Sequence, residues 1–117
     1  MSTVPEDNPS EVMSIIMNGG QARSAAMAAI KAAKARDFAA AATCMNNARV
    51  AVKNAQVAHN SLLSAEARGD GADFSVLLVH AENHLSNALT IIDMADQFVE
   101  TYRELAALEK RVNDQQG

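Results

Sequence analysis

Residues 76–105 have the sequence VLLVHAENHLSNALTIIDMADQFVETYREL, and this stretch decides the fold. Its apolar and small residues recur at alternating spacings of three and four, which is typical of an α-helix packed through a coiled-coil-like seam. A second apolar line runs beside that seam. The seam comprises Leu77, Ala81, His84, Ala88, Ile91, Ala95, Phe98, Tyr102 and Leu105, and the second line comprises Leu78, Leu85, Leu89, Ile92 and Val99. The pattern predicts one long helix that runs to about Val112.

The two apolar lines together are wider than a single bundle needs. Packing inside one three-helix subunit requires only one line, so the other predicts burial against a further surface. Another copy of the chain is the simplest source of that surface. The remaining face is polar and is expected to meet solvent, with Glu82, Ser86, Asp93, Gln97, Glu100 and Glu104.

A second helix with the same seam precedes this one. It begins after Asp37, which is suited to be its N-cap, and ends near Arg68. Its seam comprises Phe38, Ala41, Met45, Ala48, Val52, Ala55, His59 and Leu62. The glycine-rich stretch 68–72 (RGDGA) predicts a loop, after which Asp73 or Ser75 can cap the long helix.

A first helix is predicted from the segment Asn8-Pro9-Ser10-Glu11, with Asn8 as N-cap and Glu11 closing a capping box. This helix runs toward Arg36. The pair Gly19-Gly20 interrupts it at a cost of about 1 kcal/mol per glycine, which indicates a bend or a very close neighbour. Because Asp37 follows at once, the connection to the second helix is a tight turn between antiparallel neighbours.

The predicted fold class is therefore all-α, an antiparallel three-helix bundle with up-down-up topology. We expect a flexible N-terminus over residues 1–8, a helical domain over 9–112 and a frayed C-terminus over 113–117. A single domain fits a chain of 117 residues and 12.4 kDa.

Charge and composition exclude several classes of function. The net charge is −4, and no cluster of lysine or arginine is present, which argues against a nucleic-acid or anionic-membrane surface. No apolar run approaches the roughly 20 residues that cross a bilayer, and residues 1–8 do not resemble a signal peptide. We therefore expect a cytoplasmic protein. Cys44 is the single cysteine, so it forms no intrachain disulfide and is interpreted as a small apolar filler.

The histidines are the candidates for chemistry, since the chain has no glycine-rich phosphate loop and no nucleophile elbow. His59 and His84 fall on the seams, where a paired imidazole inside the bundle is the simplest interpretation. Either could instead orient His80, which lies off the seam, and His84 is better placed because it follows one turn later. On periodicity alone, His80 is equally well explained as an ordinary surface histidine.

A metal site is a weaker alternative. His80 and His84 have the spacing i, i+4 that zinc ligands use, but Glu82 points elsewhere on the helix. A metal-binding bundle of histidines and carboxylates would also need more inward carboxylates than the pattern supplies.

Residues 75–85, with the sequence SVLLVHAENHL, resemble the active-site segment of the lactose/chitobiose/cellobiose-type enzyme IIA family of bacterial sugar phosphotransferase systems. Weaker similarity covers residues 20–24, 31–34, 37–38 and 58–59, together with Asp93 and Tyr102. The resemblance implies that His80 is the phosphorylated residue. It also implies an antiparallel three-helix subunit that assembles as a homotrimer of nine helices, in agreement with the second apolar line.

By the same resemblance, the partners are the general phosphohistidine carrier protein, enzyme IIB and other copies of this chain. His80 would accept a phosphoryl group from the carrier and pass it to a cysteine of enzyme IIB, for uptake of a disaccharide of the lactose, cellobiose or chitobiose class. His84, Glu82 and His59 would support His80. No cofactor, no nucleic acid, no insertion into the membrane and no direct sugar binding are implied.

Asn83 departs from the family, which usually has an aspartate at this position of the trimer interface. Three such aspartates can gather round a metal ion, whereas three neutral amides neither repel one another nor require a cation. We therefore predict a trimer without an obligatory metal. The departure also keeps one alternative open, a non-catalytic helical scaffold or regulatory paralogue of the same fold with an inert His80.

Overall fold

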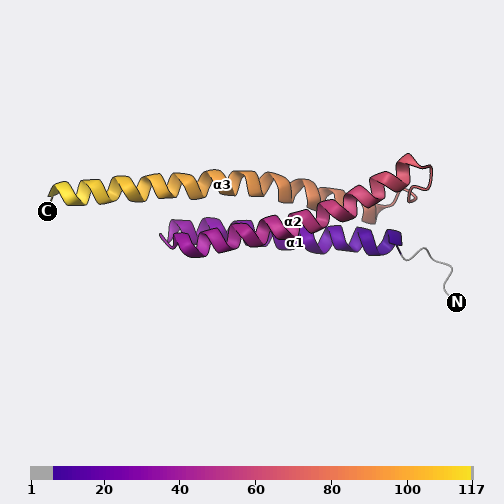
Figure 1. Cartoon of the computed structure of the whole chain (residues 1–117), viewed down its shortest axis with the longest axis horizontal. Helices are drawn as coiled ribbons and strands as arrows, with labels where there is room; N and C mark the ends of the chain where they lie inside the picture. The colour runs from indigo at the N-terminus through magenta and orange to yellow at the C-terminus, as the bar shows by residue number, and fades with distance from the viewer. Residues whose placement is uncertain (1–6, 117) are drawn as a thin grey trace.

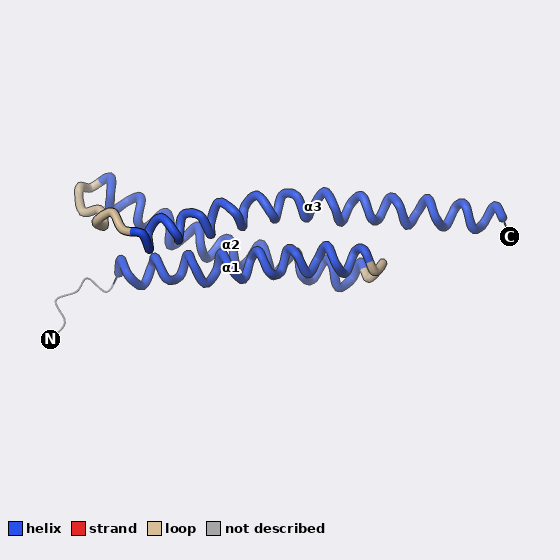
Figure 2. The backbone as a smooth tube through the Cα atoms, turned by 180° about the vertical axis from the view of Figure 1, so that it is seen from behind, coloured by secondary structure: helices blue, strands red, loops and turns tan. Residues whose placement is uncertain are grey.

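The computed structural model describes residues 7–116, with side chains over 11–116, and this part contains three helices and no strand. Helix α1 spans Asp7–Lys34, α2 spans Phe38–Ala67 and α3 spans Val76–Gln116. The first two form an antiparallel hairpin, and α3 returns alongside them in the direction of α1 (Figures 1 and 2). The predicted all-α, up-down-up bundle is confirmed. None of the described helices is both long enough and apolar enough to cross a membrane.

The turn between α1 and α2 is as tight as predicted. The backbone N–H of Ala40 donates to Asp37 Oδ1 at 3.1 Å, so Asp37 caps α2. Arg36 takes a left-handed conformation with φ 68°, and the N–H of Asp37 donates to the carbonyl of Ala32 at 2.9 Å. The bond to Ala32 satisfies one of the last carbonyls of α1, the bond to Asp37 satisfies an N–H at the start of α2, and the chain reverses between them.

The loop between α2 and α3 also lies where the glycines predict it. Gly69 has φ 85°, and the N–H of Asp70 donates to the carbonyl of Ala65 at 2.9 Å, which closes α2. The N–H of Leu78 donates to Ser75 Oγ at 3.1 Å. Of the two predicted caps for the long helix, the structure therefore uses Ser75.

The helix ends differ from prediction in three places. Helix α1 begins at Asp7, so Asn8 lies inside it rather than at its cap; the Asn8 side chain is outside the described residues. Glu11 accepts a hydrogen bond from Ser61 Oγ of α2 at 2.6 Å, because the neighbouring helix offers it a donor. Helix α3 continues to Gln116, so an end near Val112 is too early. The expected flexibility of residues 1–8 falls largely outside the described residues.

The core is built from small side chains, so the helices approach one another closely. Alanine supplies most of the buried residues, and Ile15 is the largest side chain that is fully buried. Cys44 is half-buried and packs against this core, consistent with its interpretation as a filler. Alanine side chains make few contacts each, so the fold is stabilised mainly by the close contact between helix backbones.

The buried line on α3 runs between the two predicted apolar lines and takes members from both. It comprises Ala81, Leu85, Ala88, Ile92, Ala95 and Val99. The seam residues Leu77, Phe98 and Leu105 remain 47%, 44% and 41% exposed in the subunit, so neither predicted line forms the subunit core by itself. The physical reason is that α1 and α2 approach α3 from two sides, which centres the core between the lines. On α2, Ala51 and Ala58 join the core, and Phe38 and His59 are only half-buried.

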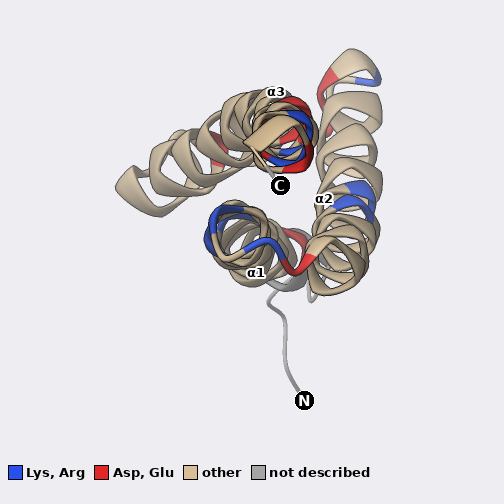
Figure 3. Ribbon diagram, turned by 90° about the vertical axis from the view of Figure 1, so that its left-hand side faces the viewer, with Lys and Arg blue, Asp and Glu red and all other residues tan. Residues whose placement is uncertain are grey.

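Helix α3 packs more extensively against α1 than against α2, and its C-terminal part projects beyond the α1–α2 turn (Figure 1). At that turn the Arg36 guanidinium pairs with Glu109 at 2.5 Å and lies over the Tyr102 ring, 5.5 Å from its centroid. Acidic and basic residues are mixed along the ribbon of the projecting end (Figure 3). The described molecule is therefore elongated, with extents of 74 × 25 × 20 Å.

Candidate functional site

His80 and His84 form one pair near the start of α3. Their Nε2 atoms lie 3.0 Å apart, with ring centroids separated by 4.4 Å and ring planes at 77°. A hydrogen bond at this distance requires that one Nε2 carries a proton and that the other presents its lone pair. His80 is exposed and His84 is half-buried. The more accessible imidazole is thus His80, the histidine predicted to lie off the seam.

Gly19 fixes the turn of α3 that carries His84. A Cβ atom added to Gly19 would lie 3.2 Å from the backbone carbon, the carbonyl oxygen and the Cβ of His84. This distance is shorter than an ordinary Cβ contact, so a side chain at position 19 would require α1 and α3 to move apart by a few tenths of an ångström. Gly20 has no atom within 4 Å of its added Cβ. The sequence predicted either a bend or a very close neighbour at this glycine pair. The close neighbour is confirmed, and only at Gly19.

His59 and Glu82 form a second pair, which joins α2 to α3. The distance from His59 Nε2 to Glu82 Oε2 is 2.9 Å, and the side chains are 22% and 44% exposed. Helical periodicity places Glu82 on the other side of α3 from His80 and His84. Among the described side chains, no hydrogen bond links the two pairs. The structure therefore divides the predicted site residues into two separate contacts.

Asn83 is exposed on α3, away from the side that packs on α1 and α2. It offers a neutral amide where the family resemblance implies a carboxylate for a metal ion. Within residues 11–116 no group of three or more His, Cys, Asp or Glu is arranged to hold a metal ion. The metal that the resemblance implies would lie between three copies of the chain, where the Asn83 amide brings no negative charge to hold a cation, so the chemistry of this side chain does not fit that metal.

A hollow of about 340 Å³ lies beside His84, between α1 and α3. Its lining consists of Arg23, His84, Asn87, Thr90 and Ile91. Sequence reasoning included Arg23 only as part of the weaker match over 20–24 and gave it no role. The signal that could have found it is its position four residues after Gly19, because that spacing repeats one face of a helix.

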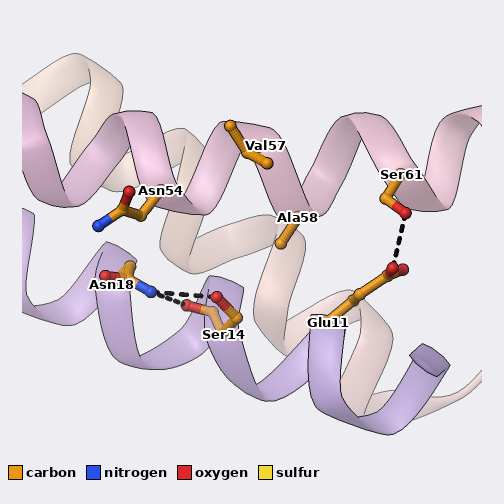
Figure 4. Close-up of a pocket in the computed structure, with 7 residues that line it drawn as sticks. All are labelled: Glu11, Ser14, Asn18, Asn54, Val57, Ala58 and Ser61. Atoms are coloured by element: carbon orange, nitrogen blue, oxygen red, sulfur yellow. Dashed lines mark hydrogen bonds between the residues drawn. The ribbon is translucent and has the colours of Figure 1, made fainter. Parts of the chain in front are cut away.

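A larger hollow of about 510 Å³ lies between α1 and α2 (Figure 4). Its polar side chains mainly satisfy one another. Ser61 donates to Glu11, and Asn18 Nδ2 donates to the carbonyl and the hydroxyl oxygen of Ser14 at 2.9 and 3.1 Å. Val57, Ala58 and Asn54 complete the lining. This hollow holds neither histidine pair.

The family described as "PTS system, Lactose/Cellobiose specific IIA subunit" has a model that matches residues 10–103. The chain belongs to this family. The matched span contains both histidine pairs, Asn83 and Arg23. The family predicted from residues 75–85 is thus confirmed. The protein is an EIIA component of the phosphotransferase system (PTS).

Curated relatives of this IIA subunit are similar in sequence over almost the whole chain. The cellobiose-specific EIIA component of Lactococcus lactis subsp. lactis (strain IL1403) is 38% identical over 106 residues, which is 91% of each chain. The N,N'-diacetylchitobiose-specific EIIA component of Escherichia coli (strain K12) is 36% identical over 105 residues, or 90% of each.

Solved structures of PTS IIA proteins share the fold. The cellobiose-specific enzyme IIA from Bacillus anthracis superposes with a TM-score of 0.83 at 37% identity, covering 92% of this chain and 94% of that one. The IIA(Chitobiose) from the IIA(Chitobiose)–HPr complex of Escherichia coli gives 0.72 at 35% identity, covering 85% and 96%.

Proposed function

We propose that this PTS IIA subunit accepts a phosphoryl group on His80 from the phosphohistidine of an HPr-type carrier and passes it to a cysteine of the matching enzyme IIB. The observation that supports this most is the exposed His80 imidazole, whose Nε2 lies 3.0 Å from His84 Nε2. A relative of this chain has been solved in complex with HPr, which supports the choice of donor.

Phosphoryl transfer requires mainly that the protein positions the accepting imidazole. A neutral imidazole has a nucleophilic nitrogen, and neutral imidazole is available at physiological pH. Its lone pair forms the new P–N bond while the bond from phosphorus to the donor nitrogen breaks, and that electron pair stays on the donor. No external base is consumed, so exposure and alignment of His80 are the main requirements. His84 is placed to set the orientation and tautomer of the ring.

The same proposal includes a homotrimer. Apolar side chains remain exposed on α3 after the subunit core is formed, among them Met94, Phe98, Leu105, Leu108 and Val112. Helical periodicity places this stripe on the side of α3 that carries Asn83. Copies of α3 packed along the stripe would remove it from water, with Asn83 at the interface and no metal required.

The sugar belongs to the lactose, cellobiose or chitobiose class in this proposal, as the names of the relatives suggest, and the carrier acts in the cytoplasm. Sugar specificity lies with other components of the system, since phosphoryl transfer between proteins needs no sugar contact on this subunit.

Labelling with phosphoenolpyruvate tests the proposal. The protein is incubated with the general phosphotransferase proteins and labelled phosphoenolpyruvate, and acid-labile label is measured. We expect label on the wild type and on the surface control Asn47→Ala, and none on His80→Ala. Adding the matching enzyme IIB should move the label to IIB, and replacing the IIB cysteine by serine should stop that transfer. Equal labelling of His80→Ala would overturn the proposal.

A further inference from the structure

Arg23 lines the hollow beside His84, and no carboxylate is among the side chains that line this hollow. The lining side chains are one guanidinium, one imidazole, the Asn87 amide, the Thr90 hydroxyl and Ile91. Arg23 forms none of the ion pairs found among the described residues. A guanidinium with neutral hydrogen-bonding neighbours is suited to an anion rather than to a cation or a sugar.

The close contact at Gly19 explains why Arg23 is there. Helices α1 and α3 run in the same direction, and Gly19 lies against the backbone of His84. One turn further along, α1 presents Arg23 and α3 presents Asn87, so both reach the same hollow. The position of Arg23 is therefore set by the same contact that positions His84.

The histidine pair places a phosphoryl group next to a residue that lines this hollow. His80 Nε2 and His84 Nε2 lie 3.0 Å apart, and when His84 Nε2 carries the proton, His80 Nε2 accepts this hydrogen bond with its lone pair. A P–N bond is much shorter than this distance, so a phosphoryl group on His80 Nε2 would displace that hydrogen bond and contact His84, which lines the hollow. Arg23 is the cationic group on that lining.

We propose that Arg23 binds the phosphoryl group carried on His80 Nε2, with Asn87 and Thr90 as neutral donors at the same hollow. This inference rests on the proposed function. When the donor's P–N bond breaks and the bond to His80 Nε2 forms, the His84 Nε2–H can donate to a phosphoryl oxygen, and the guanidinium compensates the charge that arrives. Arg23 thus stabilises the phosphorylated form of the subunit.

An equilibrium measurement separates this role from a role in docking. A residue that only docks the carrier changes the rate of transfer, but it cannot change how label divides at equilibrium between the separated donor and the subunit. A residue that binds the phosphoryl group shifts that division. The experiment therefore measures the fraction of label on the subunit after equilibration with phosphorylated carrier, for wild type, Arg23→Gln and Arg23→Lys. Lys31→Ala serves as the control, since it removes an exposed cation from the same helix.

We expect Arg23→Gln to lower the equilibrium ratio about tenfold, the size of a charge-assisted hydrogen bond. Arg23→Lys should recover part of the loss, and Lys31→Ala should match the wild type. An unchanged ratio in Arg23→Gln would overturn the inference while leaving the proposed function intact, whereas an unlabelled wild type would instead remove the proposed function itself.

Two further readouts cover the remaining outcomes. Light scattering on Arg23→Gln is expected to give the wild-type mass; a smaller mass would assign Arg23 to a contact between copies and would overturn the inference. If Arg23→Gln fails to fold, ¹⁵N NMR of the wild type decides instead. Phosphorylation should then shift the Arg23 Nε–H and Asn87 side-chain resonances, and unshifted resonances would count against the inference.

Discussion

Gly19 of α1 and His84 of α3 touch through their backbones, with only 3.2 Å between a Cβ added to the glycine and the carbonyl of the histidine. The contact joins two helices of the same direction beside the candidate site. It positions His84, which in turn contacts His80, and it brings Arg23 to the neighbouring hollow. A glycine in α1 therefore affects a site whose histidines both lie on α3.

The two adjacent glycines of α1 should respond in opposite ways to alanine. Gly20→Ala meets open space and should raise the free energy of unfolding by about 0.5–1 kcal/mol, because alanine favours a helix. Gly19→Ala gains the same propensity but forces α1 and α3 apart, so it should be less stable than Gly20→Ala by about 1 kcal/mol or more. Urea unfolding of both variants measures this. Equal effects would show that the Gly19 contact is not tight.

The projecting part of α3 tests the proposed trimer without disturbing the subunit core. Leu105→Glu places a charge on the exposed apolar stripe and should reduce the mass in solution to that of a smaller species. Ala107→Glu adds the same charge nearby on a different face, and its mass should equal that of the wild type. Light scattering at matched protein concentrations measures the mass of each variant in solution. A wild-type mass for Leu105→Glu would exclude this stripe as the interface.

Asn83→Asp should make assembly depend on a divalent cation. Three carboxylates brought together repel unless a cation or proton lies between them, whereas three amides do not. We therefore expect the wild type to keep its mass in EDTA and the variant to lose mass in EDTA and recover it with magnesium. Asn83→Ser removes the amide without adding a charge and serves as the control. A wild-type protein that dissociates in EDTA would contradict the prediction.

The contact between His59 and Glu82 should contribute little to stability. Both side chains are partly exposed, and ion pairs of this kind contribute about 0–1 kcal/mol. A double-mutant cycle with His59→Ala and Glu82→Ala measures the coupling free energy by urea unfolding. The exposed pair Arg49–Asp96, with a distance of 2.5 Å, also joins α2 to α3 and provides a matched cycle. A coupling well above 1 kcal/mol for His59–Glu82 alone would give that pair a larger structural role.

The sequence by itself determined the three helices, their order and the residues that form the two connections between them. Asp37, Gly69 and Ser75 act through bonds to backbone atoms a few residues away, so local chemistry is sufficient to place them. The string over 75–85 also identified the family and singled out His80, because the pattern of residue types there is specific.

Only the tertiary structure decided which residues meet. Periodicity assigns residues to faces of a helix, but the rotation of each helix against its neighbours determines which face becomes the core, so the buried line on α3 lies between the two predicted lines. The register of α1 against α3 brings Gly19 to His84 and Arg23 to the hollow. The register of α2 against α3 pairs His59 with Glu82. These contacts join residues far apart in the chain, so their distances depend on helix packing rather than on local sequence.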